Sequence, residues 1–421
     1  MTTTTTATAE STEDVVSFRT RARLWLKENM PPAPSPRYAE EQLDSDGVRA
    51  RSLQRTLFDG GFAGICFPKE YGGQGLSPAH QRAFSEESAP YEMPIVLNTP
   101  ALTICAPTIL DFGTEEQKRR HLPAILRGDE IWVQFLSEPT GGSDLAGLVT
   151  RADKDGDVWI LSGSKIWSTG AYRADYALCL ARTDWQATKH RGLTMFIVKI
   201  HQPSIELQQI EMVNGSKEFC QEFFDDVALP EQDVVGQVND GWTVASRLLF
   251  HERDAVGGGS PYASGIGPGT RSGPQNDVVE LAQAVGTAKD PHVRQLVAEA
   301  RVGEIVQQQL ISRVTTGLRT GYFTGPAGSI PRLYAAVNNE RRVDIELEIA
   351  GPTAGVWAGE ELGGRYGIGY LGRQGGSLGG GSNEMQRNII SERVLGMPRE
   401  YAADRDKPFE EVRRNQGPTR N

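Results

Sequence analysis

The spacing of apolar residues along the chain changes twice, and each change marks a predicted domain boundary. From residue 15 to 129, apolar residues recur every three or four positions. Val15, Phe18, Ala22 and Trp25 form the first series, and this spacing places them on one face of a helix. We therefore predict an N-terminal helical domain over this segment.

Between residues 130 and 240 the pattern changes to short runs rich in β-branched and aromatic residues. Three such runs cover residues 158–161, 176–180 and 193–198. The pair Asp155-Gly156 lies just before the first run, and an Asp-Gly pair between strands is a strong hairpin signal. The middle segment is therefore predicted to be an antiparallel β domain.

Helical spacing returns after residue 240, where Trp242, Ala245, Leu248 and Leu249 again share one helix face. It predicts a C-terminal helical domain over residues 241–400.

Three segments fall outside this pattern. Residues 1–14 are Thr-rich and lack a core-forming stretch, so we expect a disordered tail. Residues 257–274 are rich in Gly, Pro and Ser and too long for an ordinary turn, which indicates a loop or an insertion. Residues 401–421 are polar and are expected to form a frayed tail.

Composition narrows the classes of function. The chain has 44 Lys and Arg against 54 Asp and Glu, a net charge of −10, which argues against a general nucleic-acid or anionic-membrane binder. Its four cysteines lie far apart, so we expect reduced thiols in the cytoplasm and no metal site. We find neither an uninterrupted apolar run of about 18 residues nor a signal peptide, so no membrane association is predicted.

Four motifs carry the candidate chemistry, and each is short and rich in Gly, Ser or aromatic residues. They are FLSEPTGGSD at 135–144, GSKIWSTGA at 163–171, FFDDV at 223–227 and GGGSNEMQRNII at 379–390. The Gly-Gly-Ser turn that follows the first predicted strand lets backbone N–H groups approach a polar or anionic ligand closely.

In their order and spacing, these motifs resemble the acyl-CoA dehydrogenase family of flavoenzymes, over residues 15 to 399. The resemblance implies an α+β fold with an N-terminal helical domain, a middle antiparallel β domain and a C-terminal helical bundle. It also implies FAD as the cofactor, an acyl-CoA substrate from fatty-acid or steroid side-chain β-oxidation, and electron transfer to an electron-transfer flavoprotein.

The resemblance assigns several residues to the cofactor. They line the flavin or contact it, with Ser143 also near the coenzyme A arm, and they are Leu136, Ser137, Ser143, Trp167, Thr169, Ser382 and Glu384. Trp167 would stack on the isoalloxazine ring and Thr169 would donate a hydrogen bond toward its reactive edge. Taken alone, Trp167 reads as a buried core tryptophan and Ser143 as a turn serine.

The implied reaction is α,β-desaturation, in which a carboxylate removes the α-proton and a hydride leaves the β-carbon for flavin N5. Gly380 stands where many members carry that carboxylate. Glycine keeps its backbone N–H, which the resemblance assigns to the developing enolate oxygen. The catalytic base can instead come from elsewhere in the chain.

Glu252 is the candidate base. It follows Leu248 by four residues and Leu249 by three, so it shares their buried helix face, where partial desolvation raises a carboxyl pKa. The chain resembles the isovaleryl- and long-chain-acyl types of the family, which place the catalytic glutamate at the position of Glu252 and a small residue near that of Gly380. The alternative is that Glu252 pairs structurally with Arg253, which we otherwise assign to the substrate, or with another arginine. His251 is expected to be structural or pocket-lining.

Two departures from the family pattern affect the predicted assembly. The usual Arg-x-x-Phe-Gly block does not occur between residues 257 and 297, and Gln-x-x-Gly-Gly becomes EIAGP at 348–352. Both changes alter the half of the FAD site that crosses the subunit interface. We predict a homodimer or homotetramer, or a heteromer like those of actinobacterial members that act on steroid side chains. The other interpretations are a non-catalytic or half-site subunit of such a heteromer, and a flavin monooxygenase of the same fold.

Overall fold

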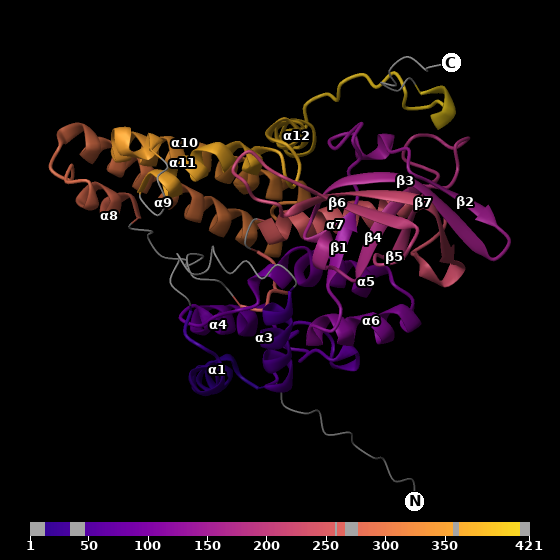
Figure 1. Ribbon diagram of the computed structural model, residues 1–421, viewed down its shortest axis with the longest axis horizontal. Helices are drawn as coiled ribbons and strands as arrows, with labels where there is room; N and C mark the ends of the chain where they lie inside the picture. The colour runs from indigo at the N-terminus through magenta and orange to yellow at the C-terminus, as the bar shows by residue number, and fades with distance from the viewer. Residues whose placement is uncertain (1–12, 34–46, 257–258, 266–276, 357–361, 413–421) are drawn as a thin grey trace, which may run out of the picture. The chain divides into compact units, whose positions relative to one another are not determined.

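The computed structural model describes residues 13–33, 47–256, 259–265, 277–356 and 362–412 (Figure 1). The chain divides into two units, of which the first contains residues 1–98, 119–129 and 261–271 and the second contains the remainder. Nearly all of the predicted N-terminal tail, and most of the Gly/Pro-rich segment 257–274, lie outside the described residues.

The first unit is helical, as the apolar spacing predicts. Its elements are α1 (Val15–Asn29), α3 (Val48–Asp59), α4 (Pro78–Ser88) and the greater part of α6 (Glu115–Arg127). The Asp14 side chain caps α1 by accepting hydrogen bonds from the N–H groups of Val16 and Ser17.

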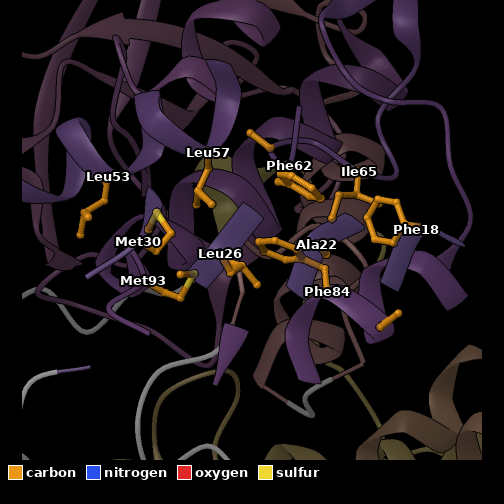
Figure 2. Packing of buried hydrophobic residues seen from close by; sticks show 12 residues of the cluster. Phe18, Ala22, Leu26, Met30, Leu53, Leu57, Phe62, Ile65, Phe84 and Met93 are labelled. Atoms are coloured by element: carbon orange, nitrogen blue, oxygen red, sulfur yellow. The ribbon is translucent and has the colours of Figure 1, made fainter. Parts of the chain in front are cut away.

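Figure 2 shows the core of this unit, where α1 contributes Phe18, Ala22 and Leu26, all fully buried. Phe62 and Phe84 stack beside them with ring centroids 5.5 Å apart. Val15 and Trp25, the other two members of the predicted series, are partly buried against the same cluster. The first predicted helix face is therefore confirmed.

A mixed β-sheet forms the centre of the second unit. Its strands are β1 (Trp132–Phe135), β2 (Arg151–Asp155), β3 (Val158–Thr169), β4 (Tyr176–Arg182), β5 (Leu193–Lys199), β6 (Ile205–Ile210), β7 (Phe219–Pro230) and β8 (Val234–Val235). Their order is β6-β7-β3-β2-β4-β5-β8, with β1 on β4. Most pairs are antiparallel, as predicted, but β1 and β2 both run parallel to β4. The predicted hairpin joins β2 to β3, where Asp155 pairs with Val158 around Gly156 at φ +57°.

Helices make up the rest of this unit. They are α5 (Ala106–Phe112), α7 (Gly241–Val256), α8 (Asp277–Ala284), α9 (Pro291–Arg319), α10 (Ser329–Ala350), α11 (Leu362–Gly372) and α12 (Asn383–Ile389). Figure 1 shows α8, α9, α10 and α11 side by side, and buried residues such as Leu296 and Ile345 join them in one core. Asp290 caps α9 by accepting from the N–H groups of His292 and Val293.

Part of the segment 401–412 packs against the β-sheet domain through Asp404, Phe409 and Val412, so the expectation of a frayed tail is wrong for that part. Phe409 is fully buried, its N–H donates to Ala187 O at 2.9 Å, and its ring lies 3.4 Å from the guanidinium carbon of Arg182. One aromatic side chain placed over a buried cation anchors an otherwise polar segment. Residues 413–421 lie outside the described part of the chain.

Within the described residues, one stretch, Ile95–Phe112, is long and apolar enough to cross a membrane. In this structure 61% of that stretch is buried inside the protein, as in a core helix.

Candidate active site

Glu252 lies near the end of α7, on the face that also carries the buried Leu248. The residue is partly buried, and this burial raises the pKa of its carboxyl group, as the helix-face argument predicts. A hydrogen bond from Gln134 on β1 and the positive charges of Arg253 and Arg332 act in the opposite direction without cancelling the effect of burial. The carboxyl group therefore has the raised pKa that suits a general base.

The alternative role of Glu252 was a structural ion pair with an arginine. Among the residues that the structure describes, no ion pair joins Glu252 to Arg253 or Arg332. Both arginines influence Glu252 through their charge alone, and burial lowers the pKa of each guanidinium while Glu252 raises it.

Arg332 connects α10 to the glycine-rich loop of the C-terminal motif. Only 4% of the residue is exposed, and its Nη2 donates to the carbonyl of Gly376 at 2.7 Å and also to that of Gly379. From α12, Gln386 Nε2 donates to Gly380 O at 3.2 Å and to Gly381 O at 3.0 Å. The buried side chains of Arg332 and Gln386 therefore bind four backbone carbonyls of this loop, those of Gly376, Gly379, Gly380 and Gly381.

Gly380 has φ +70°, a left-handed conformation that glycine adopts without strain. For its N–H the structure records no hydrogen bond within the described part of the chain, whereas its carbonyl is bound by Gln386. The N–H is thus available to an outside acceptor. Ser382 caps α12 by accepting from Met385 N–H at 3.3 Å, and Glu384 is exposed and pairs with Arg387.

His251 points away from this chemistry. Its Nε2 lies 2.9 Å from Asp111 Oδ2, and Arg247 Nε donates to the same oxygen at 2.6 Å. These contacts join α7 to α5, so the residue has the structural role that we expected.

The first two motifs meet at a buried lysine. Lys165 Nζ donates to Leu136 O at 3.0 Å and to Glu138 Oε1 at 2.9 Å, and both charged side chains are inaccessible to solvent. Ile166 N–H also donates to Ser137 O at 2.9 Å. Burial alone would raise the pKa of Glu138, but Lys165 and hydrogen bonds from Thr150 and Val149 lower it.

Trp167 stands on a β-bulge where the pairing of β3 with β7 shifts between Ile166 and Ser168. Its φ is +67°, which is strained for a tryptophan, and half of its surface is exposed. Phe219 supports the ring edge-on at 5.8 Å. The reading of Trp167 as a core residue is therefore wrong. Thr169, two residues on, is exposed on the same strand.

Beneath this bulge, Ser168 points inward and donates from Oγ to Glu222 Oε2 at 3.0 Å. Glu222 is 0% exposed and faces Lys165 across the β3–β7 pair, and its Oε1 has no partner among the described residues. Burial raises the pKa of Glu222 to about 8. Sequence reasoning missed Glu222, Lys165 and Glu138, although the alternation of a half-buried strand places Lys165 on the inner face.

Ser143 and its neighbour Asp144 are exposed in the turn of the first motif. Lys189 Nζ lies 2.8 Å from Asp144 Oδ2 and 2.8 Å from Asp404 Oδ2. Arg182 Nη2 donates to Ala146 O at 2.7 Å in the same segment. The docked C-terminal segment is thereby linked to the motif that carries Ser143.

Comparison with known proteins agrees with this geometry. The family model "Acyl-CoA dehydrogenase, N-terminal domain" matches residues 12–129, and "Acyl-CoA dehydrogenase, middle domain" matches residues 134–227. Acyl-CoA dehydrogenase IpdE1 of Mycobacterium tuberculosis is 33% identical over 402 residues, which are 92% of this chain and 99% of that protein. The chain belongs to the acyl-CoA dehydrogenase family.

Solved structures of acyl-CoA dehydrogenases share the whole fold. The Tcur3481-Tcur3483 steroid ACAD has a TM-score of 0.75 and 29% identity, covering 93% of this chain and 100% of its own. The ChsE4-ChsE5 complex from Mycobacterium tuberculosis has a TM-score of 0.71 and 25% identity, covering 94% and 100%. The predicted family and fold are confirmed, and the protein is an acyl-CoA dehydrogenase, an oxidoreductase.

Proposed function

We propose that this acyl-CoA dehydrogenase desaturates an acyl-CoA thioester between its α- and β-carbons, with Glu252 as the base that removes the α-proton. The observation that carries the proposal is the carboxyl group of Glu252. It is partly buried on α7, accepts a hydrogen bond from Gln134, and is not engaged in an ion pair among the described residues. A carboxylate in this state keeps the basicity that proton abstraction needs.

Gly380 supplies the complementary group. Its N–H is free to donate to the thioester oxygen, where negative charge develops as the α-proton leaves. Arg332 and Gln386 hold the neighbouring carbonyls, so that donor keeps its place when substrate binds. Arg253, partly buried beside Glu252, is assigned to the substrate.

The middle domain offers a surface that fits FAD. Trp167 presents a half-exposed ring and Thr169 an exposed hydroxyl on the same strand, and Ser137 and Ser143 lie in the motif joined to that strand. Leu136, in the same motif as Ser137, is buried, and its carbonyl accepts a hydrogen bond from Lys165. These residues would hold FAD, which would supply the acceptor for the β-hydride at N5 and the route by which electrons pass to an electron-transfer flavoprotein. We also assign Ser382 and Glu384, at the N-terminus of α12, to the FAD site.

We place the enzyme in the cytoplasm, acting on a fatty-acid or steroid side-chain thioester. The steroid reading is supported by similarity to the Tcur3481-Tcur3483 steroid ACAD. That structure and the ChsE4-ChsE5 complex each combine two differently named chains, which supports a heteromer beside the homodimer or homotetramer. Expression of this chain alone, with light scattering and flavin content, separates a complete enzyme from a half-site subunit.

The change Glu252→Gln tests the base. It keeps the size and hydrogen bonding of the side chain but removes the basic carboxylate, so flavin content and acyl-CoA binding should be retained. Flavin reduction in rapid-mixing experiments should slow by ~10²–10⁴-fold. The rate of flavin reduction is measured with a panel of four thioesters: butyryl-, isovaleryl-, octanoyl- and cholanoyl-CoA.

Glu346→Gln is the matched control, since Glu346 lies on α10 in an ion pair with Arg342, 3.0 Å away. It should reduce flavin at the parental rate. If Glu252→Gln did the same, Glu252 would not be the base.

A further inference from the structure

Arg332 is a buried cation that the proposed proton transfer does not by itself require. It enters the protein interior from α10, in a position where arginines are rarely buried without a paired anion. Its Nη2 serves the carbonyls of Gly376 and Gly379, while its Nε is buried without a hydrogen-bond partner among the described residues. A cation kept in such a desolvated place indicates a function.

Arg332 acts on both of the groups that the proposed reaction uses. Its donors end at the loop that carries Gly380, and its charge acts on Glu252. The other groups that act on Glu252 are Arg253 on the same helix and Gln134 from β1. The thiol of Cys105 also lies within electrostatic range of Glu252, and burial strongly raises the thiol's pKa, so it carries no charge at neutral pH.

We propose that Arg332 is a positioning residue for this reaction, holding the Gly380 loop in place and keeping the nearby Glu252 side chain as a carboxylate. The inference rests on the proposed role of Glu252. The positive charge of Arg332 favours the ionised carboxylate of Glu252 before substrate binds. The hydrogen bonds from Arg332 fix the carbonyls of Gly376 and Gly379, and the Gly379 carbonyl shares a peptide plane with the N–H of Gly380, which is thereby oriented. One guanidinium thus coordinates the group that takes the proton with the group that receives the enolate charge.

An arginine suits both requirements, since Nη2 of Arg332 donates to the carbonyls of Gly376 and Gly379 while the guanidinium keeps its positive charge. The planar guanidinium holds that nitrogen in a fixed orientation, whereas the ammonium of a lysine is a single charged centre on a flexible stem. Arg332→Lys therefore keeps the charge but weakens the hold on the loop, and Arg332→Met removes both. The control is Arg341→Met, which lies on the same helix but pairs with Glu299 on the surface at 2.6 Å.

Two measurements on the full-length, flavin-loaded enzyme separate these effects. The first is the pH dependence of flavin reduction by the thioester of the panel that reduces the parental enzyme fastest. The second is amide hydrogen exchange over residues 375–386, which needs no substrate. In Arg332→Met, the acid limb of the pH profile should move up by about one pH unit, because loss of a nearby positive charge makes a carboxylate harder to form.

In the same variant, the limiting rate should fall about tenfold or more and loop exchange should accelerate. Arg332→Lys should keep the parental acid limb but show the faster exchange. The inference is overturned if Arg332→Met matches Arg341→Met in either measurement. It is also overturned if Arg332→Lys shifts the acid limb as Arg332→Met does, or exchanges at the parental rate. Should Arg332→Met fail to fold, the lysine variant decides.

This outcome is independent of the test of the base itself. If Glu252→Gln is slow while both Arg332 variants behave like the control, the base stands and this inference falls. If Glu252→Gln is fast, the proposed base falls, whatever the loop exchange shows.

Discussion

Replacing Glu222 with glutamine should stabilise the protein at pH 8 and above, while leaving its stability near pH 5 almost unchanged. Glu222 is inaccessible to solvent, and one of its oxygens has no partner in the described structure. Its other oxygen accepts the hydroxyl of Ser168 at 3.0 Å. Glutamine keeps that acceptor and nearly the same volume but does not ionise.

The magnitude follows from the pKa of Glu222, which burial raises from 4.5 to about 8. Between these two values the folded protein retains a proton that the unfolded chain has lost, so stability falls as pH rises through this window. At about 1.4 kcal/mol for each tenfold change in the proton equilibrium, the full cost above pH 8 is about 5 kcal/mol. Movement of Lys165 toward the ionised carboxylate would reduce it to about 2 kcal/mol.

The assay is thermal unfolding of the wild type and Glu222→Gln from pH 5 to pH 9, followed by tryptophan fluorescence. For cooperative unfolding of all 421 residues, about 1 kcal/mol corresponds to ~1 °C in Tm, so the variant should gain ~2–5 °C at pH 9. Glu206→Gln, on the exposed side of the neighbouring β6, is the control and should show no such pH dependence. Equal Tm differences at pH 5 and pH 9 would refute the reasoning.

Three further outcomes are expected. Phe409→Ala should destabilise the protein by about 3–5 kcal/mol, because it uncovers Arg182 and leaves a cavity; an unfolding midpoint equal to that of Tyr401→Ala, an exposed control in the same segment, would show that the docking contributes nothing. The double change Glu252→Gly with Gly380→Glu should restore only part of the flavin-reduction rate lost in Glu252→Gly. The φ of +70° at position 380 costs a glutamate about 1–2 kcal/mol, and full recovery in rapid mixing would contradict this. Co-purified FAD should be lost on dissociation of the oligomer, as measured by absorbance after size separation; a monomer that retains full FAD would disprove it.

Much of the fold could be predicted because periodicity reports directly on burial. The series from Val15 to Trp25 and the hairpin at Asp155-Gly156 both occur as expected, since each depends on neighbouring residues alone. The docking of residues 401–412 gave no such signal. It depends on one residue, Phe409, meeting Arg182 from a strand more than two hundred positions earlier.

The candidate site shows the same division. The partial burial of Glu252 could be predicted because its helix face is fixed by Leu248. Arg332 was missed, since an arginine in a helix ordinarily extends into solvent. Its partners are the backbone carbonyls of Gly376 and Gly379, and because every residue has a carbonyl, the sequence does not indicate which ones an arginine will bind. Contacts of this kind become visible only in three dimensions.

The position of Phe409 also bears on how the protein is made. The middle domain is synthesised well before Phe409, yet its buried Arg182 is covered by the side chain of that residue, more than two hundred positions later. Domains generally fold in order as they leave the ribosome, from the N-terminus onward. Here the β-sheet domain can complete its packing only after Phe409 has been synthesised. A product terminated before that residue would leave the Arg182 cation uncovered, so closure of the middle domain requires translation to continue more than two hundred residues beyond Arg182.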